Sequence, residues 1–306
     1  MSRVLITRKL PGAALERLHA LHSVDVWDGV LPPEPTVLRE RAARAEGLLT
    51  MLTDRVDAAL LDAAPRLRVV ANYAVGSDNV DLEECAQRGV AVGVTPDALT
   101  EATADLAFAL ILAAARNLIA GHEAVRDGNW RTWEPQGWLG HDVHGATLAL
   151  IGAGRIGEAV ARRAQGFSME VLRVGRRDDL HAALEQADFI SLHCPLTPQT
   201  RHLIDAAALR HAKPSAILVN TARGAVVDQH ALKDALDDGR LAAAALDVTD
   251  PEPLPPGDPL LSAPNLLVLP HVGSATHSAR ARMAELAVDN LLAGLDGRPL
   301  PHLARH

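Results

Sequence analysis

Short apolar runs, many of them β-branched, alternate with longer Ala- and Leu-rich helical patterns along nearly the whole chain. This alternation is typical of parallel sheets whose strands are connected by helices, and it restricts the fold to the α/β class. One series of runs ends before Thr100 and a second begins after Gly145. We therefore predict two parallel sheets, with strands at residues 4–6, 24–26, 47–49, 69–71 and 90–92, and at 148–151, 170–174, 189–192, 216–219, 243–248 and 266–269.

The segment between the two series differs from both. An Ala-rich helical pattern runs from Thr100 to about Ala120 and is long enough to connect two lobes. The stretch 129–144 is irregular, and it contains three of the four tryptophans of the chain. We expect this stretch to form an extended loop or an interface arm.

The composition is that of a soluble globular chain, with 48% hydrophobic and 22% charged residues and a net charge of −8. An acidic chain is not expected to bind nucleic acid or an anionic membrane, because either partner needs a basic surface. The longest apolar run, 106–115, falls well short of the roughly 20 residues that a membrane-spanning helix needs. Two cysteines and no secretory signal favour a cytoplasmic protein.

A glycine-rich sequence, Gly152-Ala153-Gly154-Arg155-Ile156-Gly157, follows the predicted strand 148–151 directly and precedes the helical stretch 158–165. In this context Gly152 permits a tight turn, Gly154 lets a pyrophosphate approach the backbone, and Gly157 lets the helix pack on the strand. The alternative is a tight turn with incidental glycines. The position between strand and helix favours a dinucleotide site.

Ligands of a doubly wound sheet bind at the carboxyl ends of its strands. In the second series Arg223 follows the fourth strand, the fifth strand runs into Asp247 and then Glu252, and His271 follows the sixth. A guanidinium that binds a carboxylate, an acid that orients a histidine and a proton-donating histidine are the groups that a 2-oxoacid reductase needs. Each residue also has a structural alternative, as a helix cap, a solvated turn acid or a core histidine.

Other histidines have less support from their positions. The six strands match two mononucleotide-binding halves, so the third strand is expected on the far side of the point where the strand order reverses. His193 ends this strand and is expected to line the cofactor. No two histidines have the i,i+4 spacing with an acid that marks a helical zinc site, so no metal is expected.

Six segments form a series of motifs along nearly the whole chain: 75–81, 152–157, 191–197, 220–224, 247–248 with 252–253, and 270–276. These motifs, in this order, resemble those of the NAD(P)-dependent D-isomer-specific 2-hydroxyacid dehydrogenases. Within that family, Trp130 to Trp133 and the residues around Glu252 and Ser274 are most similar to those of glyoxylate/hydroxypyruvate reductases.

The resemblance implies an α/β fold of two doubly wound parallel-sheet domains. Residues 1–98 and 278–306 would form a flavodoxin-like substrate domain, which includes a helical pattern from Ser278. Residues 99–277 would form a Rossmann NAD(P)-binding domain, with a dimerisation arm at about 99–144. The chain would then cross twice between the domains and form a hinge.

The resemblance also implies the roles of individual residues. His271, Glu252 and Arg223 would be catalytic. The backbone amides of Val75 and Gly76 would hold the substrate carboxylate, as a glycine-containing turn after a strand is suited to do. Arg223, His271, Ser274 and Trp138 would also contact the substrate, the last from the partner of a homodimer. The implied cofactor-binding residues are Gly152, Gly154, Arg155, Ile156, Gly157, Arg176, Arg177, Cys194, Pro195, Thr200, Thr221, Ala222, Asp247 and Gly273.

The residues that follow the second strand of the second series indicate which cofactor is preferred. NAD-specific sites place an acid there to bind both ribose hydroxyls. Gly175 occupies this position, and Arg176 and Arg177 follow with guanidinium groups suited to a 2′-phosphate. We therefore expect NADPH to be preferred, with NADH possible. Asp178 and Asp179 come next, and either could pair with the arginines or supply the missing acid.

The predicted function is the reduction of a small 2-oxoacid, glyoxylate or hydroxypyruvate, to the D-2-hydroxyacid. Two alternatives stay open. One is a dehydrogenase for another 2-hydroxyacid, such as 3-phosphoglycerate. The other is a nucleotide-sensing, corepressor-like binding protein, because a fold does not fix a function.

Overall fold

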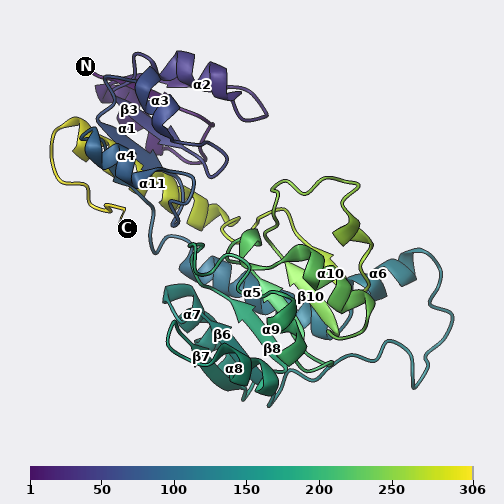
Figure 1. Ribbon diagram of the computed structural model, residues 1–306. Helices are drawn as coiled ribbons and strands as arrows, with labels where there is room; N and C mark the ends of the chain where they lie inside the picture. Colours follow the sequence, from purple (N-terminus) through teal and green to yellow (C-terminus); the bar gives the residue numbers. More distant parts are fainter. Residues whose placement is uncertain (305–306) are drawn as a thin grey trace. The chain divides into compact units, whose positions relative to one another are not determined.

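A computed structural model describes residues 1–304 (Figure 1). These residues divide into two compact units. Unit 1 contains Met1–Leu99 and the C-terminal segment that begins at Ala275, and unit 2 contains Thr100–Ser274. Each unit is built on its own sheet, in which every pair of neighbouring strands is parallel, as the alternating pattern of the sequence predicts.

The sheet of unit 1 has the strand order β2-β1-β3-β4-β5. Successive strand residues point to opposite faces, and both faces are covered by helices, so most of these strands are apolar throughout. Helices α1 and α11 cover one face, and α2, α3 and α4 cover the other. The strands are β1 (Arg3–Ile6), β2 (Ser23–Val26), β3 (Gly47–Thr50), β4 (Val69–Asn72) and β5 (Ala91–Gly93), and the helices are α1 (Ala14–Leu21), α2 (Pro35–Ala42), α3 (Ala58–Ala63), α4 (Leu82–Gln87) and α11 (His277–Leu295).

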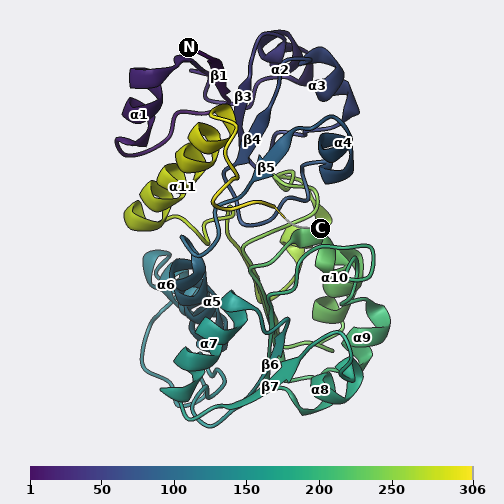
Figure 2. The same cartoon turned by 90° about the vertical axis from the view of Figure 1, so that its left-hand side faces the viewer.

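The sheet of unit 2 has the strand order β11-β10-β9-β8-β6-β7. Helices α5 and α7 lie on one face, and α8, α9 and α10 lie on the other (Figure 2). The strands are β6 (Thr147–Ile151), β7 (Glu170–Val174), β8 (Phe189–Leu192), β9 (Ile217–Asn220), β10 (Ala243–Leu246) and β11 (Leu266–Val268), and the helices are α5 (Thr100–Ala115), α6 (Leu118–Arg126), α7 (Arg155–Gln165), α8 (Leu180–Gln186), α9 (Ala206–His211) and α10 (Gln229–Asp237), with short 3₁₀ turns at Gly224–Val226 and Pro259–Ser262.

The place predicted for the third strand of unit 2 is wrong. β8 pairs with β6 and β9, so it lies inside the sheet on the same side of β6 as the remaining strands. β7 is the edge strand instead, and its exposed Glu170 and Arg173 suit an edge. β8, with the sequence FISL, is buried at every position. The strand order therefore reverses between β6 and β8, and His193 stands directly beside the first strand.

The helix expected from Thr100 to about Ala120 is two helices. α5 ends at Ala115, Asn117 adopts a left-handed conformation with φ of 51°, and α6 starts at Leu118 after a bend of 61°. Asparagine tolerates this conformation better than most residues, which makes it a frequent residue just after a helix. In the described part of the chain no single helix is long and apolar enough to cross a membrane. Helices α5 and α6 have the necessary length and composition only when taken together, and they are bent relative to each other.

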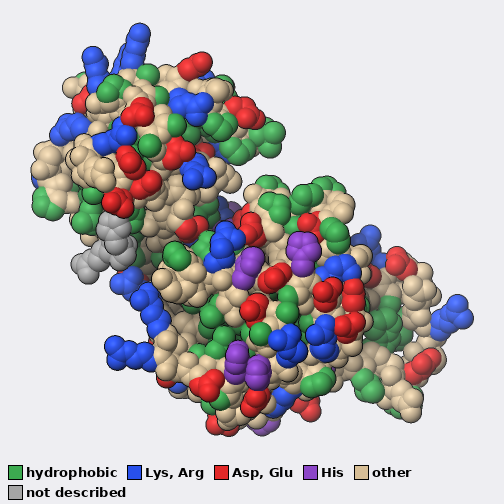
Figure 3. Space-filling model, viewed as in Figure 1, with side chains coloured by type: hydrophobic (Ala, Val, Ile, Leu, Met, Phe, Trp, Pro, Cys, Tyr) green, Lys and Arg blue, Asp and Glu red, His purple; other side chains and the backbone are tan. Residues whose placement is uncertain are grey.

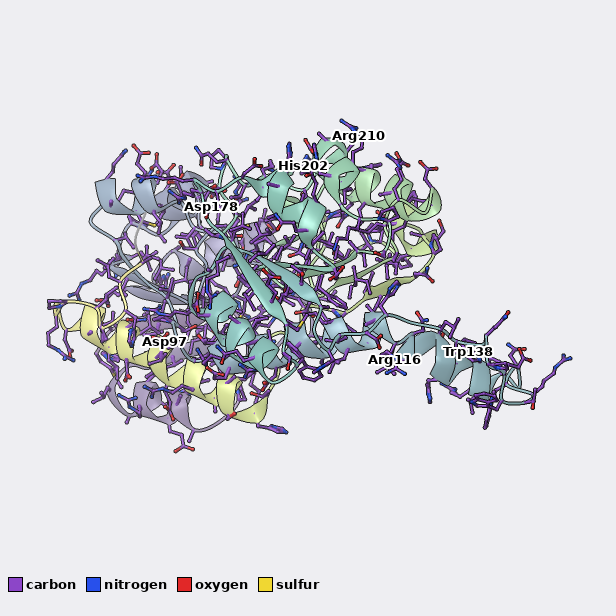
Figure 4. The ribbon with its side chains drawn as sticks, turned by 90° about the horizontal axis from the view of Figure 1, so that it is seen from below. Asp97, Arg116, Trp138, Asp178, His202 and Arg210 are labelled. Carbon is purple, nitrogen blue, oxygen red and sulfur yellow. The ribbon has the colours of Figure 1, made fainter. Side chains whose placement is uncertain are left out.

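An arm, residues 117–140, projects from unit 2 (Figures 1 and 4). It consists of α6 and an irregular loop, which confirms the loop predicted for 129–144. Two hydrogen bonds close its base, from Asn117 Nδ2 to the carbonyl of Leu139 (3.0 Å) and from the N–H of His141 to the carbonyl of Ala115 (2.8 Å). Hydrophobic side chains are visible on its surface in Figure 3. The exposed fractions are 57% for Trp130, 78% for Trp133 and 53% for Trp138.

Candidate active site

The glycine-rich loop between β6 and α7 is shaped by its three glycines. Gly152 has φ of +91°, and a Cβ atom there would lie 2.6 Å from the backbone nitrogen of Cys194. At Gly157 a Cβ atom would lie 2.7 Å from the carbonyl oxygen of Gly152, whereas nothing lies within 4 Å of the corresponding point at Gly154. The loop therefore packs tightly at both ends and is open in the middle, where a pyrophosphate needs space.

Helix α7 begins at Arg155, directly after Gly154, and no side chain caps it. The first N–H groups of an α-helix have no partner within the helix, and the helix dipole favours an anion at this end. Arg155, Ile156 and Gly157 form this first turn. Together with the open position at Gly154, the turn forms a site suited to the phosphates of a dinucleotide.

Two buried polar atoms at the carboxyl edge of the same sheet have no hydrogen-bond partner among the described residues. They are Nδ1 of His193, which follows β8, and Oγ1 of Thr221, which follows β9. A buried polar atom without a partner costs roughly 1–3 kcal/mol. β8 pairs with β6, the strand that ends in the glycine-rich loop, and β9 pairs with β8, so these atoms lie at the same edge as that loop and fit a nicotinamide dinucleotide as ligand.

The ring of His193 forms a hydrogen bond with Ser191, whose Oγ lies 2.9 Å from Nε2. Burial lowers the pKa of His193 to about 4. The ring is therefore neutral at physiological pH and does not act as a proton donor. Its place beside Cys194, against the glycine-rich loop, gives it a structural role there.

The loop after β8 holds three residues that were assigned to cofactor binding. Cys194 is buried, and burial raises the pKa of its thiol, so it is a packing residue rather than a thiolate. Thr200 donates to the carbonyl of Pro195 (2.6 Å) and accepts from the N–H of Thr197 (2.8 Å). Thr200 thus fixes the shape of the 195–200 loop.

The loop that carries His271 is fixed by a buried carboxylate. Asp247, 1% exposed, follows β10 and accepts hydrogen bonds from the N–H groups of Val272 and Gly273, each at 2.7 Å. Burial raises the pKa of Asp247, although these two hydrogen bonds act in the opposite direction. Thr103 Oγ1 holds the carbonyl of Gly273 at 3.1 Å. The carboxylate that we expected to contact the cofactor therefore binds the loop that carries His271.

His271 itself is paired with Glu252. The distance from Nδ1 of His271 to Oε1 of Glu252 is 2.5 Å, and both side chains are partly exposed. His271 has a positive φ of 54°, which is uncommon outside glycine and often marks a functional position. Since Nδ1 is engaged by the carboxylate, Nε2 is the nitrogen that remains for proton transfer.

Arg223 stands on the loop after β9, the strand next to β10. Asn220, the last residue of β9, fixes this loop by donating to the carbonyl of Arg223 (2.9 Å) and accepting from the N–H of Ala222 (3.0 Å). A Cβ atom at Gly224 would lie 2.0 Å from the carbonyl carbon of Thr249, so the loops after β9 and β10 are closely packed. The loops that carry Arg223, Glu252 and His271 thus follow three neighbouring strands.

The region after β7 supplies the residues that were assigned to a 2′-phosphate. β7 ends at Val174, and Gly175 follows directly. Arg176 and Arg177 are exposed, and neither is paired with a carboxylate in the part of the chain that the structure describes. Asp178 accepts the N–H of Gly175 at 2.7 Å, and Asp179 caps α8 through the N–H of Ala182. The two acids therefore shape the turn and leave the arginines unpaired.

In unit 1 the loop 73–79 follows β4 at the carboxyl edge of that sheet. Val75 is exposed and Gly76 is partly exposed. Their backbone N–H groups donate to no acceptor within the described residues. Two consecutive free N–H groups suit a carboxylate.

Sequence reasoning missed the side chains that fix these loops. Asn220 and Asn72 are each the polar last residue of an otherwise apolar buried strand, which was the available signal. The role of Asp247 as a clamp had no signal, because its partners lie 25 and 26 residues further along the chain. Within the described residues no group of three or more His, Cys, Asp or Glu side chains could hold a metal ion.

Residues 108–273 match the family model of the D-isomer specific 2-hydroxyacid dehydrogenase NAD-binding domain. Over 98% of its length the chain is 47% identical to a glyoxylate reductase of Korarchaeum cryptofilum, covering 95% of that protein. It is 43% identical to the glyoxylate reductase of Thermococcus litoralis, covering 98% of this chain and 96% of that protein.

Solved structures are similar over the same length. A protein from Thermus thermophilus has 49% sequence identity and a TM-score of 0.94, with 99% of this chain and 100% of that chain covered. An NADPH-dependent glyoxylate/hydroxypyruvate reductase from Sinorhizobium meliloti, in complex with NADP and malonate, has 32% identity and a TM-score of 0.86, with 99% and 96% covered.

We predict that His193 makes the protein less stable in acid. Its folded-state pKa of about 4 is lower than the unfolded value of about 6.5, so the unfolded state binds the proton first. Stability is constant above about pH 7 and falls as the pH decreases from 6.5 toward 4, by roughly 3 kcal/mol in total. The His193→Gln variant should lose less stability between pH 7.5 and pH 4.5 than the unmodified protein in urea unfolding.

His230→Gln, at an exposed position on α10, is the matched control and should follow the unmodified protein. An equal loss of stability in the His193→Gln and His230→Gln variants would contradict the prediction.

Proposed function

Since the chain belongs to the D-isomer specific 2-hydroxyacid dehydrogenases, we propose that it reduces glyoxylate or hydroxypyruvate with NADPH, giving the D isomer where the product is chiral. It is an NAD(P)-dependent dehydrogenase of 2-oxoacids and 2-hydroxyacids. The observation that carries the proposal is the His271–Glu252 pair, held at the carboxyl edge of a sheet whose first strand ends in a dinucleotide loop. We further propose that unit 2 is the cofactor domain and unit 1 the substrate domain.

A nicotinamide cofactor held by the glycine-rich loop would supply the hydride for the carbonyl carbon. As the C=O π bond breaks, its electron pair moves to the oxygen, and protonated His271 donates the proton from Nε2 to that oxygen. Glu252 holds the ring through Nδ1, which leaves Nε2 as the nitrogen that faces the substrate oxygen. Asp247 keeps the backbone of His271 in place through Val272 and Gly273.

The carboxylate of the substrate needs donors of its own. Arg223 binds it and polarises the neighbouring carbonyl group, since a guanidinium presents several N–H donors in one plane. The free amides of Val75 and Gly76 bind the carboxylate as well. The chain positions these groups, and positioning is the main task of the protein when the cofactor carries the chemistry.

Loss of the acid–base pair should abolish most of the activity. His271→Ala and Glu252→Gln should each lower kcat with glyoxylate and NADPH by roughly 100-fold or more, the scale of losing a positioned acid or the group that orients it. His230→Ala, at the exposed site on α10, should keep near-normal turnover in the same spectrophotometric assay. Near-normal turnover in both site variants would remove His271 from the role of proton donor.

The preference for NADPH rests on Arg176 and Arg177, which are exposed and free of carboxylate partners among the described residues, with Gly175 where an acid would bind the ribose. Arg176→Ala should weaken NADPH binding about 10- to 100-fold, as for a lost charge-assisted hydrogen bond, and should change NADH binding little. Fluorescence titration of both cofactors measures this. Arg210→Ala, an exposed arginine on α9, is the control. A catalytic efficiency with NADH that equals that with NADPH in the unmodified protein would contradict the preference.

We also propose a homodimer that buries the arm, with Trp138 reaching the substrate site of the partner. Exposed tryptophans on a projecting segment form an apolar surface of the kind that a partner covers. Light scattering at micromolar concentration should give the mass of two chains, and the W130S/W133S/W138S variant should give the mass of one. The control is Trp27→Ser, which changes the fourth tryptophan, in unit 1. A monomeric unmodified protein would refute the dimer, and an unchanged substrate profile in Trp138→Ala would refute the reach of Trp138.

A further inference from the structure

A cluster of polar side chains lies at the carboxyl edge of the unit 1 sheet. Thr50 and Asn72 are paired in register as the last residues of β3 and β4, and both are fully buried. Asn79, partly buried, joins them from the far end of the loop 73–79. Buried amides need several partners at once, so such a cluster fixes whatever is attached to it.

Asn72 uses the full hydrogen-bonding capacity of its side chain. Its Oδ1 accepts from Oγ1 of Thr50 (3.1 Å) and from Nδ2 of Asn79 (3.2 Å). Its Nδ2 donates to Oδ1 of Asn79 (2.9 Å) and to the carbonyl of Gly76 (2.9 Å). The last of these bonds draws the middle of the loop back onto the end of the strand.

Asn79 ties the loop to the neighbouring turn after β3. Its Nδ2 donates to the carbonyls of Met51 (3.0 Å) and Asp54 (2.9 Å), and its own carbonyl accepts the N–H of Val56 (2.9 Å). The turn is itself closed by the buried carboxylate of Asp54, which accepts the N–H of Met51 (2.8 Å). The two ends of the loop 73–79 are thus anchored at Asn72 and Asn79.

Between the two anchors, the loop has one carbonyl group that is hydrogen-bonded and two N–H groups that are not. The carbonyl of Gly76 is engaged by Asn72, whereas the N–H groups of Val75 and Gly76 have no acceptor within the described residues. An anion site needs free N–H groups on a fixed backbone. A mobile loop would lose conformational entropy on binding, and this loss would weaken the affinity.

We propose that Asn72 and Asn79 are positioning residues for the 2-oxoacid carboxylate: their paired amides fix the loop 73–79 so that the N–H groups of Val75 and Gly76 are held ready to bind it. This inference rests on the proposed function, in which those two amides bind the substrate carboxylate. Neither asparagine touches the reacting atoms. Their effect is on substrate affinity rather than on hydride or proton transfer.

The test compares Asn79→Asp with the unmodified protein. The new oxygen would face the carbonyls of Met51 and Asp54 and Oδ1 of Asn72, three acceptors that now share the Nδ2 group. KM for glyoxylate should rise about 10- to 100-fold with kcat within about threefold, the pattern of a binding interaction that is equal in ground and transition states. The Kd of oxalate, a non-reacting dicarboxylate, should rise in parallel in the presence of NADPH, and the Kd of NADPH alone should stay constant.

A milder variant keeps the test decisive if Asn79→Asp does not fold. Thr50→Val removes only the hydrogen bond to Asn72 at nearly constant volume, and it should raise KM by roughly two- to fivefold. Asn290→Asp is the matched control, because Asn290 is also a fully buried unit 1 amide and donates to the carbonyl of Val94 (2.9 Å), directly after β5, rather than to the loop 73–79. It should lower the melting temperature and leave KM unchanged.

An unchanged KM and oxalate Kd in folded Asn79→Asp or Thr50→Val would overturn the inference and leave the proposed function standing. The same increase of KM in Asn290→Asp would also overturn it, because the effect would then be general destabilisation. Failure of the unmodified protein to bind oxalate or to reduce any 2-oxoacid would remove the proposed function and the inference together.

Discussion

The carboxylate of Asp247 holds two backbone N–H groups of the loop that carries His271, and the geometry of the His271–Glu252 pair depends on this contact. His271 has a positive φ, a conformation that costs free energy and persists only where its surroundings impose it. The clamp and the hydrogen bond from Thr103 to Gly273 impose it here. The ring then meets Glu252 through one nitrogen and keeps the other free, as proton donation requires.

A similar arrangement is found in the loops after β9 and β4. Asn220 fixes the loop of Arg223, and Asn72 fixes the loop of Val75 and Gly76. Both are last residues of buried strands, where a polar side chain can reach the first backbone groups of the loop that follows. Parallel sheets provide regular strand ends, and a few buried polar side chains convert the irregular loops after them into fixed sites.

The α/β fold and the strand positions could be predicted from the sequence because they depend on local apolar patterns. The position of β8 could not be predicted by counting strands, although its largely apolar sequence and the polar residues of β7 indicated which of the two was the edge. The break at Asn117 could not be predicted, because it depends on the left-handed conformation of one residue and not on the helix propensity of the segment. Arg223, Glu252 and His271 were predicted because they follow strands, whereas the hydrogen bonds of Asp247 join residues 25 and 26 positions apart and have no local signal.

The proposed reduction of a 2-oxoacid to the D-2-hydroxyacid is tested by determining which isomer of the product forms. Hydroxypyruvate gives a chiral product on reduction, so hydride and proton delivery to an oriented 2-oxoacid must yield one isomer. We expect the protein with NADPH to convert hydroxypyruvate to D-glycerate alone, as determined by chiral chromatography. Formation of L-glycerate, or of both isomers in similar amounts, would contradict it.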